Sequence, residues 1–279
     1  MTAKKKESGP VAFESWYSGL FGDRWPTLKS ALSLPATRVS WDEGLIKPYF
    51  LDAGSVEAAL SLPAPPPGGR IIDMCAAPGG KTLVLTRLVG DGSVLVSNEF
   101  SRDRRRRLAT VLEEHLDPAK LPAVTVTGYD AAKWAGHERA AADRILLDAP
   151  CSSERHVLAS SRHLAEWTPA RIRNLAQRQW ALLSAAWLVL APGGILVYAT
   201  CALSPEENDG VVSRLMKKYG DEAVPAEYRS SGRYPELRPE RTEFGVHILP
   251  DTSGGAGPMY MAILAKKAAA GERDGSART

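Results

Sequence analysis

Apolar residues after position 62 fall into short runs that alternate with segments of helical spacing. The runs predict strands at Arg70–Met74, Ser93–Ser97, Ala123–Thr127, Asp143–Leu147 and Ile195–Thr200. The helical segments between them span 80–90, 101–116 and 169–190, and a further helix is expected after Ser204. Short apolar strands that alternate with helices are typical of a mostly parallel sheet covered on both faces. The pattern therefore predicts an α/β fold.

The last apolar runs of this region have a different spacing. Phe244–Leu249 and Pro258–Leu264 lie close together with no helical segment between them, which favours an antiparallel hairpin at the edge of the sheet. A parallel core of five strands followed by such a hairpin is the layout of the class I methyltransferases, a Rossmann-like fold. There are no internal repeats.

The chain before residue 63 has helical periodicity instead. Phe13, Trp16, Tyr17 and Leu20 recur at spacings of three and four. Trp25-Pro26 ends this helix, and a second helix is expected to follow. The proline-rich stretch 63–69 is a strong boundary signal. We therefore expect an N-terminal helical appendage at 11–62, an α/β domain at 63–266, and disordered tails at 1–10 and 267–279.

Composition narrows the function only slightly. The chain has 279 residues and a formal net charge of +3, so overall charge does not identify a nucleic-acid-binding protein. No apolar run is long enough to span a bilayer, and the N-terminus resembles neither a secretory signal nor a transit peptide, so a cytoplasmic location is expected. The three cysteines, Cys75, Cys151 and Cys201, have neither disulfide nor zinc spacing. They are expected to act as thiols, with no bound metal.

The turn after the first predicted strand is rich in Gly, Ala and Pro. In the stretch IIDMCAAPGGKT, residues 71–82, it would let a ligand approach the backbone at the start of a helix. It matches neither GxGxxG nor GxxxxGK[ST], and alone it also fits a simple tight connection. Glu99 follows the second strand about 20 residues on, where a ribose diol would be held. Asp130 follows the third strand, where it would accept from an adenine amino group. Either acid alone also fits a capping or turn residue, but together the three positions favour a nucleoside cofactor.

Two cysteines follow the next two strands. Cys151 lies in Asp148-Ala-Pro-Cys-Ser, and Cys201 in Ala-Thr-Cys-Ala, so both are expected beside the cofactor crevice. A single free cysteine is usually a buried, inert residue, but two at neighbouring strand ends beside Asp148 indicate chemistry. Addition of a thiolate to carbon 6 of cytosine would make carbon 5 able to accept a methyl group. Asp148, either protonated or hydrogen-bonded to the exocyclic amine, would stabilise the ring, and a second thiol would assist elimination.

The combination of DMCAAPGGKT, DAPCS and YATC resembles the Sun/Nop (Fmu) family of RNA cytosine-5 methyltransferases over roughly residues 45–265. The resemblance implies S-adenosyl-L-methionine as cofactor, Cys201 as nucleophile and Cys151 in product release. DNA cytosine methyltransferases use the Pro-Cys position instead, so this division of roles comes from the resemblance alone. The implied cofactor-binding residues are Cys75, Ala76, Ala77, Pro78, Gly79, Gly80, Lys81, Glu99, Arg104, Asp130 and Asp148.

Further stretches are similar to the short, stand-alone branch typified by the mitochondrial small-subunit rRNA enzyme: FGDRWPTLKSAL, KPYFLDAGS, CSSERH and GPMY. This similarity implies a cytosine of small-subunit rRNA in a partly assembled subunit as substrate, with a protein partner as a further expectation. Two features depart from the family pattern. Glu99 stands where Asp is commoner, and the stretch 152–156 replaces a glycine-containing one.

Basic residues near the predicted site are candidates for phosphate contact. One set is Arg102 and Arg104–Arg107, of which Arg102, Arg105 and Arg106 better fit a solvated helix face. The other set comprises Arg155, His156, Arg162, His163, Arg171, Arg173 and Arg178. Trp41, Tyr49 and Phe50 are candidates for base stacking, although such aromatics more often belong to a core.

Four alternatives remain. The same chemistry on tRNA is the main one, and a catalytically silent ribosome-assembly factor is more remote because the cofactor turn and both cysteines are intact. A methyltransferase of exocyclic amines would need an Asn/Asp-Pro-Pro-aromatic turn at Asp148–Cys151. A dehydrogenase would need GxGxxG.

Overall fold

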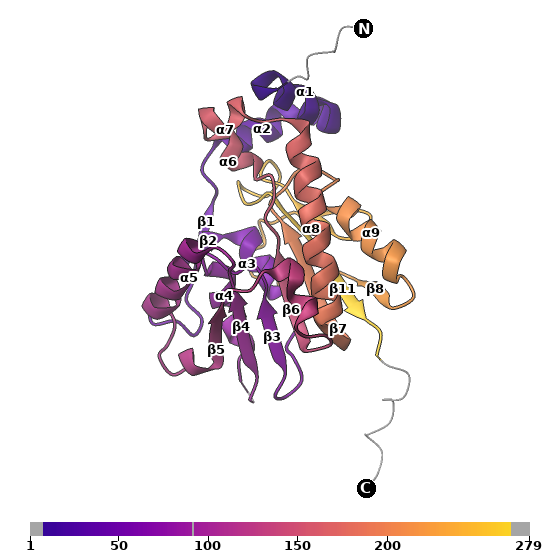
Figure 1. Ribbon diagram of the computed structural model, residues 1–279. Helices are drawn as coiled ribbons and strands as arrows, with labels where there is room; N and C mark the ends of the chain where they lie inside the picture. Colours follow the sequence, from indigo (N-terminus) through magenta and orange to yellow (C-terminus); the bar gives the residue numbers. More distant parts are fainter. Residues whose placement is uncertain (1–7, 91, 269–279) are drawn as a thin grey trace.

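The computed structural model describes residues 8–90 and 92–268 and contains one large mixed sheet (Figure 1). Its nine strands have the order β5-β4-β3-β6-β7-β11-β10-β9, and β8 also pairs with β11. Strands β3 to β7 run parallel, and those after β7 pair antiparallel. The strands are β3 Arg70–Asp73, β4 Val94–Asn98, β5 Val124–Thr127, β6 Ala142–Asp148, β7 Leu190–Thr200, β8 Ala223–Ala226, β9 Glu240–Arg241, β10 Val246–Ile248 and β11 Met259–Lys266.

Helices cover both faces of this sheet. Successive strand residues point to opposite faces, so Ile71 packs with the α3 and α4 side, and Ile72 packs with the α8 and α9 side. On the first side lie α3 Ala53–Leu60, α4 Gly80–Leu85, η2 Thr86–Leu88 and α5 Arg102–His115. On the second lie η4 Ala131–Gly136, α8 Pro169–Val189 and α9 Asp209–Tyr219. The short η3 Leu121–Ala123 precedes β5.

The predicted α/β fold, a class I methyltransferase layout, is confirmed. Each strand expected between residues 70 and 200 is present, and α4, α5, α8 and α9 follow them as predicted. The C-terminal hairpin is present as β10 and β11, and β11 lies between β7 and β10 in the sheet. Across the described residues, every helix is too short or too polar to cross a lipid bilayer.

The region expected to form a helical appendage, 11–62, contains strands as well as helices. Helices α1 Gly9–Phe21 and α2 Trp25–Ser33 are present, joined by η1 Gly22–Arg24, but an antiparallel hairpin follows. Its strands are β1 Arg38–Trp41 and β2 Tyr49–Asp52. These short segments alternate between exposed and buried side chains and are rich in aromatic and β-branched residues, which favours strands over helix.

Helices α1 and α2 pack above the carboxyl ends of the parallel strands, against α6 Glu154–Leu158 and α7 Ser161–Ala165 (Figure 1). Aromatic rings fill this contact: Tyr17 stacks on Trp25, with ring centroids 5.2 Å apart, and Phe13 meets Trp167 edge-on. The arrangement places the N-terminal helices over the loop that contains Cys151.

The division of the chain between residues 62 and 63 stays a prediction. In the structure, α3 shares the core of the sheet rather than packing with α1 and α2. The predicted tails lie mostly outside the described residues, but Gly9 and Pro10 already belong to α1.

Candidate active site

The carboxyl ends of the parallel strands bring the predicted site residues to one edge of the sheet. Asp73 ends β3, Asn98 ends β4, Asp148 ends β6 and Thr200 ends β7. The Gly-rich turn follows β3, while the two cysteine loops follow β6 and β7. Because β3 and β6 are neighbours, as are β6 and β7, these three loops lie side by side.

The turn after β3 is shaped by the left-handed backbone of Gly79, at φ 118°. A Cβ at this position would lie 3.0 Å from a methyl group of Val111, so α5 packs directly on the turn. From α5, Arg104 donates to the carbonyl of Ala77 at 2.8 Å. A cavity opens on the other side of the turn. It is lined by Tyr49, Leu51, Ser55, Asp73, Cys75–Pro78, Gly80, Lys81 and Asp148.

A second cavity adjoins the first at Cys75 and extends toward β4 and β5. Glu99, only 5% exposed, lines it and is paired with Arg104 at 3.3 Å. Its carboxylate also accepts from the backbone N–H of Ser101 at 2.8 Å. Asp130 lines the same cavity, and its carboxylate caps η4. Glu99 is therefore a buried wall residue rather than a solvated helix-start acid.

Asp73 is a site residue that the sequence analysis did not single out. One carboxylate oxygen accepts from the Thr82 hydroxyl at 2.7 Å, and the other has no hydrogen-bond partner among the described residues. Burial raises the pKa of Asp73 to about 7, aided by the nearby charge of Asp148 and opposed by the Thr82 hydrogen bond. A buried carboxylate oxygen without a donor at the wall of a cavity indicates a position for a ligand donor or cation.

Lys81 connects this cavity to the cysteine loops. Its ammonium group lies 2.8 Å from a carboxylate oxygen of Asp148 and 3.1 Å from the Ser55 hydroxyl. Burial disfavours the charge, but Asp148 outweighs it, so the pKa of Lys81 is raised. Lys81 thereby holds Asp148 in place through one carboxylate oxygen. The other oxygen of Asp148 is not bound to Lys81.

The donor set of the two cavities fits S-adenosylmethionine. Its cationic and hydroxyl groups need acceptors, and carboxylates of Asp73, Glu99 and Asp130 line the cavity walls. Cationic side chains near those walls are paired with acids: Lys81 with Asp148, Arg104 with Glu99 and Lys133 with Asp130. Burial raises the pKa of the Cys75 thiol, so this residue contributes a neutral wall.

Cys151 and Cys201 lie next to each other. Their sulfur atoms are 3.0 Å apart, and both also approach the Ser153 hydroxyl, at 3.1 Å for Cys201 and 3.5 Å for Cys151. The hydrogen bond with Cys201, together with burial, raises the pKa of Cys151 well above its ordinary value. Cys151 is therefore held as a neutral thiol beside Cys201.

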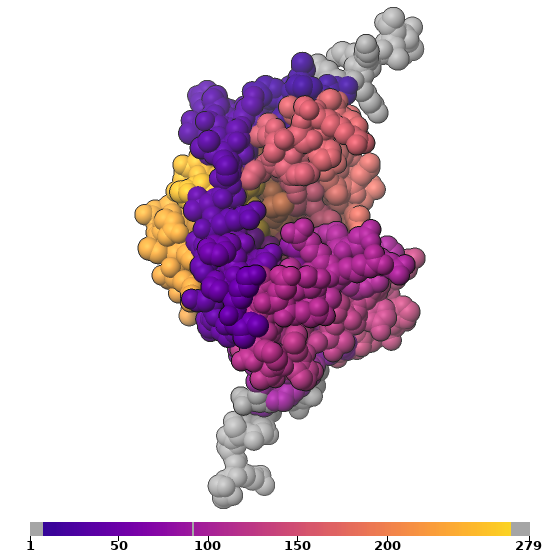
Figure 2. Space-filling model, turned by 90° about the vertical axis from the view of Figure 1, so that its left-hand side faces the viewer, coloured from indigo at the N-terminus to yellow at the C-terminus, as the bar shows by residue number. Residues whose placement is uncertain are grey.

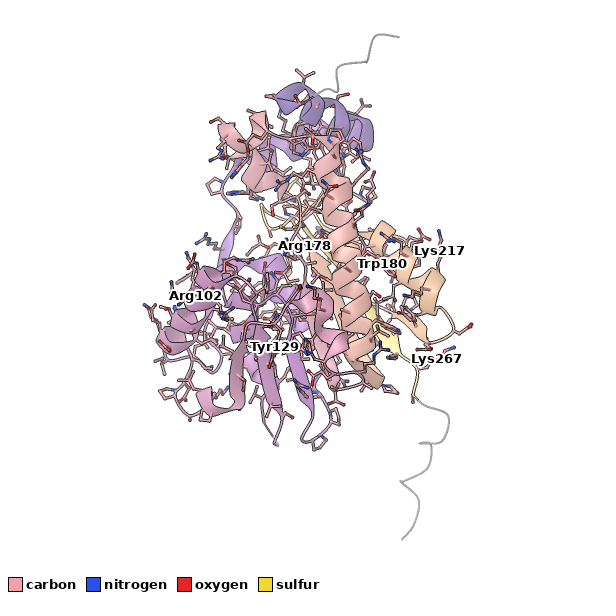
Figure 3. All side chains as sticks on the ribbon, in the orientation of Figure 1. Arg102, Tyr129, Arg178, Trp180, Lys217 and Lys267 are labelled. Carbon is pink, nitrogen blue, oxygen red and sulfur yellow. The ribbon has the colours of Figure 1, made fainter. Side chains whose placement is uncertain are left out.

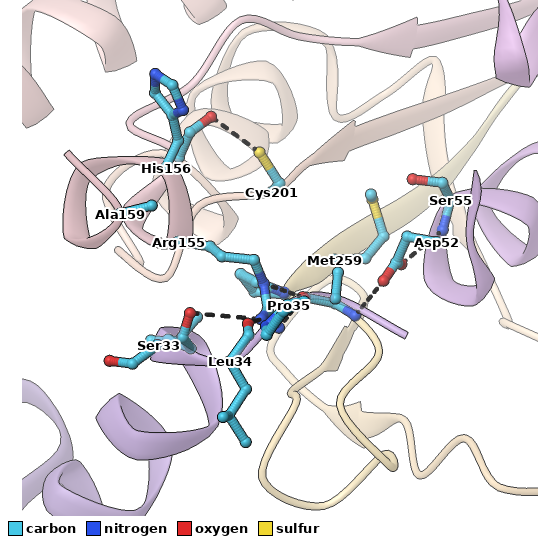
Figure 4. A pocket seen from close by; sticks show the side chains of 15 residues that line it. Ser33, Leu34, Pro35, Asp52, Ser55, Arg155, His156, Ala159, Cys201 and Met259 are labelled. Atoms are coloured by element: carbon cyan, nitrogen blue, oxygen red, sulfur yellow. Dashed lines mark hydrogen bonds between the residues drawn. The ribbon is translucent and has the colours of Figure 1, made fainter. Parts of the chain in front are cut away.

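A larger cavity, about 510 Å³ in volume, opens at Cys201. Ser55 lines both this cavity and the smaller one at the Gly-rich turn, so the two adjoin there. Figure 4 shows Cys201 at its wall, with Asp52, Arg155, His156 and Met259 around it. In Figure 2 the surface is hollowed where the indigo N-terminal segments meet the pink and magenta parts of the chain.

Two buried acids hold the cysteine loops together. Glu154 accepts from the hydroxyls of Tyr17 and Ser152 and, at 3.0 Å, from the backbone N–H of Leu203. Glu207 accepts from the backbone N–H of Ser152 at 3.0 Å. Burial, together with the neighbouring Glu154 charge, raises the pKa of Glu207 to about 7.

The predicted cofactor positions other than Gly79, together with Cys201, line these adjoining cavities, and Cys151 lies beside Cys201 without lining them. Their individual roles remain predictions. The sequence analysis missed Ser55, Asp73, Ser153, Glu154 and Glu207. Four of these residues lie within stretches that carry the family resemblance: Asp73 in DMCAAPGGKT, Ser55 in KPYFLDAGS, and Ser153 and Glu154 in CSSERH.

The candidates for RNA contact are placed differently from one another. The guanidinium group of Arg155 donates to backbone carbonyls, among them Gly257 at 2.8 Å, so it is engaged within the protein. Arg178 lines the second cavity, and Figure 3 shows it on α8, with Arg102 on α5. Trp41 is buried in the core, whereas Phe50 is 58% exposed.

Comparison with known proteins agrees with this geometry. Residues 60–265 match the family described as 16S rRNA methyltransferase RsmB/F. The mouse mitochondrial tRNA (cytosine(34)-C(5))-methyltransferase is 33% identical over 83% of this chain and 67% of its own length. The bovine 5-cytosine rRNA methyltransferase NSUN4 is 32% identical, over 80% of this chain and 60% of its own length. Ribosomal RNA small subunit methyltransferase F of Serratia proteamaculans is 34% identical, and the match spans only 36% of that protein.

Solved structures show the same fold. NSun6 from Pyrococcus horikoshii, whose structure is titled as containing SFG, superimposes with a TM-score of 0.62 at 28% identity, over 81% of this chain and 54% of that one. A methyltransferase homolog protein from the same organism has a TM-score of 0.67 at 24% identity, over 91% and 94% of the two chains.

The fold and the cavities at the strand ends define a class I S-adenosylmethionine-dependent methyltransferase. Within this class, the chain belongs to the RsmB/F family of 16S rRNA methyltransferases.

Proposed function

We propose that this protein transfers a methyl group from S-adenosylmethionine to carbon 5 of a cytosine in RNA. The observation that carries the proposal is the pair of cysteine sulfurs, 3.0 Å apart, with Cys201 at the wall of the larger cavity, which adjoins the cofactor-side cavity at Ser55. Members of this family to which the chain is similar are named for cytosine-5 methylation of rRNA or tRNA. The chain spans 36% and 60% of the length of two of the relatives that it matches.

Cys201 is the nucleophile in this proposal. Its sulfur lies at the wall of the larger cavity, where it can meet a base that has left its stack. The thiolate forms a bond to carbon 6, and the electron pair of the 5,6 double bond moves toward carbon 5. S-adenosylmethionine, when bound, supplies an electrophilic methyl group. Carbon 5 accepts that group while Cys201 remains attached at carbon 6.

Asp148 orients the base. The sequence left open whether this carboxyl is protonated or accepts a hydrogen bond. Asp148 accepts a hydrogen bond from the Lys81 ammonium group at 2.8 Å, which supports the hydrogen-bonding alternative. Asp148 therefore accepts from the exocyclic amine of cytosine, and Lys81 fixes the direction of its carboxylate.

Cys151 assists release. After methylation the proton on carbon 5 must leave, the 5,6 double bond must re-form, and the Cys201 thiolate must depart from carbon 6. The raised pKa of Cys151 keeps it a thiol, and this S–H can hydrogen-bond to the departing sulfur 3.0 Å away.

The cofactor is proposed to be held by the turn Cys75–Lys81, by Glu99 and Asp130 in the second cavity, and by Asp73 at the unpartnered oxygen. Arg104 acts on this site through its contacts with Glu99 and Ala77, so it positions the turn. Glu99 provides a carboxylate acceptor on a longer side chain than that of Asp, the residue that is commoner at this position in the family.

The substrate is proposed to be a cytosine of small-subunit rRNA in a partly assembled particle. A protein partner is proposed to contribute to recognition of this RNA. The description of the matching family supports rRNA, and a cytoplasmic location is proposed with it. The chain's net charge of +3 supports recognition that depends on folded RNA rather than on charge alone.

The test is methyl incorporation into naked rRNA, into small subunits from a strain that lacks the gene, and into bulk tRNA, with mass spectrometry of the digested nucleosides. We expect 5-methylcytidine in the subunits. Labelling of tRNA with none in the subunits would replace the rRNA substrate by tRNA. Methylation of another base position would overturn the proposed reaction.

A further inference from the structure

Ser153 has a backbone conformation that is unusual for its residue type. Its φ and ψ are 53° and 63°, in the left-handed region, and in the part of the chain that the structure describes only Ala140 is another non-glycine residue with positive φ. Serine is strained there because its Cβ crowds the backbone, whereas glycine adopts this conformation freely. Such conformations concentrate at functional sites.

The surroundings of Ser153 hold this conformation in place. On one side, the Ser152 backbone N–H donates to Glu207 and its hydroxyl donates to Glu154. On the other side, the carbonyl of Ser153 accepts from the backbone N–H of Val157 at 3.0 Å at the start of α6. The loop is therefore fixed by its neighbours, and the hydroxyl of Ser153 takes no part in fixing it.

That hydroxyl contacts sulfur only. In the described residues, its hydrogen bonds join it to Cys201 at 3.1 Å and to Cys151 at 3.5 Å. The bond to Cys201 is the dashed line at the Cys201 sulfur in Figure 4. A thiolate carries no hydrogen, so the Ser153 O–H must be the donor whenever Cys201 is ionised. A hydrogen bond to a charged acceptor is among the stronger kinds.

We propose that Ser153 is a catalytic residue whose hydroxyl donates a hydrogen bond to the Cys201 thiolate, both before it attacks the base and as it departs. This inference rests on the proposed function, in which Cys201 is the nucleophile. The residue makes and breaks no covalent bond. It stabilises the negative charge on sulfur, which is present before addition and returns on elimination.

The substitution Ser153→Gly separates this role from a structural one. Glycine accepts the left-handed backbone without strain and removes the hydroxyl, so the fold should be retained or gain stability. Ala140→Gly is the matched control, because it relieves the same kind of strain at an exposed position outside the lining of the cavities. Ser153→Ala also removes the hydroxyl but keeps the Cβ. It therefore tests whether loss of the hydroxyl has the same effect when the strained backbone is retained.

The readouts are kcat/KM for RNA methylation as a function of pH, the KM for S-adenosylmethionine, and the melting temperature. For Ser153→Gly and Ser153→Ala we expect about a tenfold loss at neutral pH, which diminishes as the pH rises because the rising limb of the profile moves up by about one unit. The KM for the cofactor should be unchanged. Ala140→Gly should match the wild type in activity.

A wild-type pH profile for both Ser153 variants would overturn the inference. Loss of activity equal at every pH, together with a lowered melting temperature, would also overturn it, because that result indicates a structural role. The Cys201→Ala variant, assayed in parallel, separates the two proposals. If it is inactive while the Ser153 variants are normal, only the role of Ser153 fails, and if it is active, the nucleophile assignment fails.

Discussion

The sulfur atoms of Cys151 and Cys201 lie 3.0 Å apart, although 50 residues separate them in the chain. The contact exists because β6 and β7 are parallel neighbours, so the residues that follow their carboxyl ends share one edge of the sheet. A single thiol would suffice to attack the base. In the proposed reaction, one of these two thiols attacks the base and the other assists the departure of the first.

Replacement of Cys151 by Ala is expected to trap the protein on RNA. The nucleophile remains, but the thiol that assists its departure from carbon 6 is lost, so the adduct through Cys201 accumulates. A denaturing gel of the variant with substrate RNA and cofactor should show a band of reduced mobility. Cys75→Ala is the control without such a band. Normal turnover of Cys151→Ala with no adduct would show that Cys151 has only a structural role.

Cofactor affinity is expected to rise with pH through neutrality. Burial raises the pKa of Asp73 to about 7, so its carboxyl is mostly neutral at pH 6 and mostly ionised at pH 8. A cationic cofactor binds the ionised form more tightly. The titration of Asp73 therefore predicts an affinity for S-adenosylmethionine that is about tenfold higher at pH 8 than at pH 6.

The measurement is calorimetric titration of S-adenosylmethionine at several pH values for the wild type and Asp73→Asn. At each pH, the affinity of the wild type is divided by that of Asp73→Asn. Any effect of the cofactor's own titration is the same for both proteins and cancels in this ratio. We expect this ratio to change between pH 6 and pH 8. A ratio independent of pH would contradict the role given to Asp73.

Tyr17→Phe is expected to lower the free energy of unfolding by roughly 1–3 kcal/mol. The phenol of Tyr17 is fully buried and donates to Glu154, and without it that buried carboxyl loses one of its donors. Tyr219→Phe is the control, since no hydrogen bond of the Tyr219 hydroxyl is found in the described structure. Urea denaturation compares the two variants. Equal effects would show that the bond to Glu154 contributes no stability of its own.

Arg155→Lys is expected to destabilise the fold by roughly 1–3 kcal/mol, because an ammonium group cannot replace the several guanidinium bonds to the carbonyls of 31–34 and 255–257. Arg162→Lys, at an exposed ion pair with Glu166, should change stability by less than about 0.5 kcal/mol. Thermal unfolding tests the pair. Unchanged stability of Arg155→Lys with weakened RNA binding would instead restore Arg155 as a phosphate contact.

Much of the fold could be predicted from the sequence because its strands are short, apolar and separated by clear helices. The cofactor turn and the cysteine loops followed from the rule that parallel strand ends meet at one edge. The hairpin at 38–52 was missed because its strands have only four residues each, too few for alternation to stand out.

Other parts of the site depend on contacts between distant loops, which no local pattern records. Glu154 is an acid at the start of a short helix, and such a residue is usually exposed, yet it is fully buried between helix α1 and the two cysteine loops. Arg155 looked available for phosphate because its carbonyl partners lie about 100 residues away in the chain. The left-handed backbone of Ser153 could not be foreseen from a residue that rarely adopts it.

The most direct test of the account is methyl transfer by Cys201→Ala. Incorporation of label from S-adenosylmethionine into small-subunit rRNA should fall to background, because Cys201 is the one cysteine among the described residues that line the larger cavity. Cofactor affinity should stay close to that of the wild type, since Cys201 lies outside the cavity at the Gly-rich turn. Substantial methylation of cytosine by this variant would contradict the account.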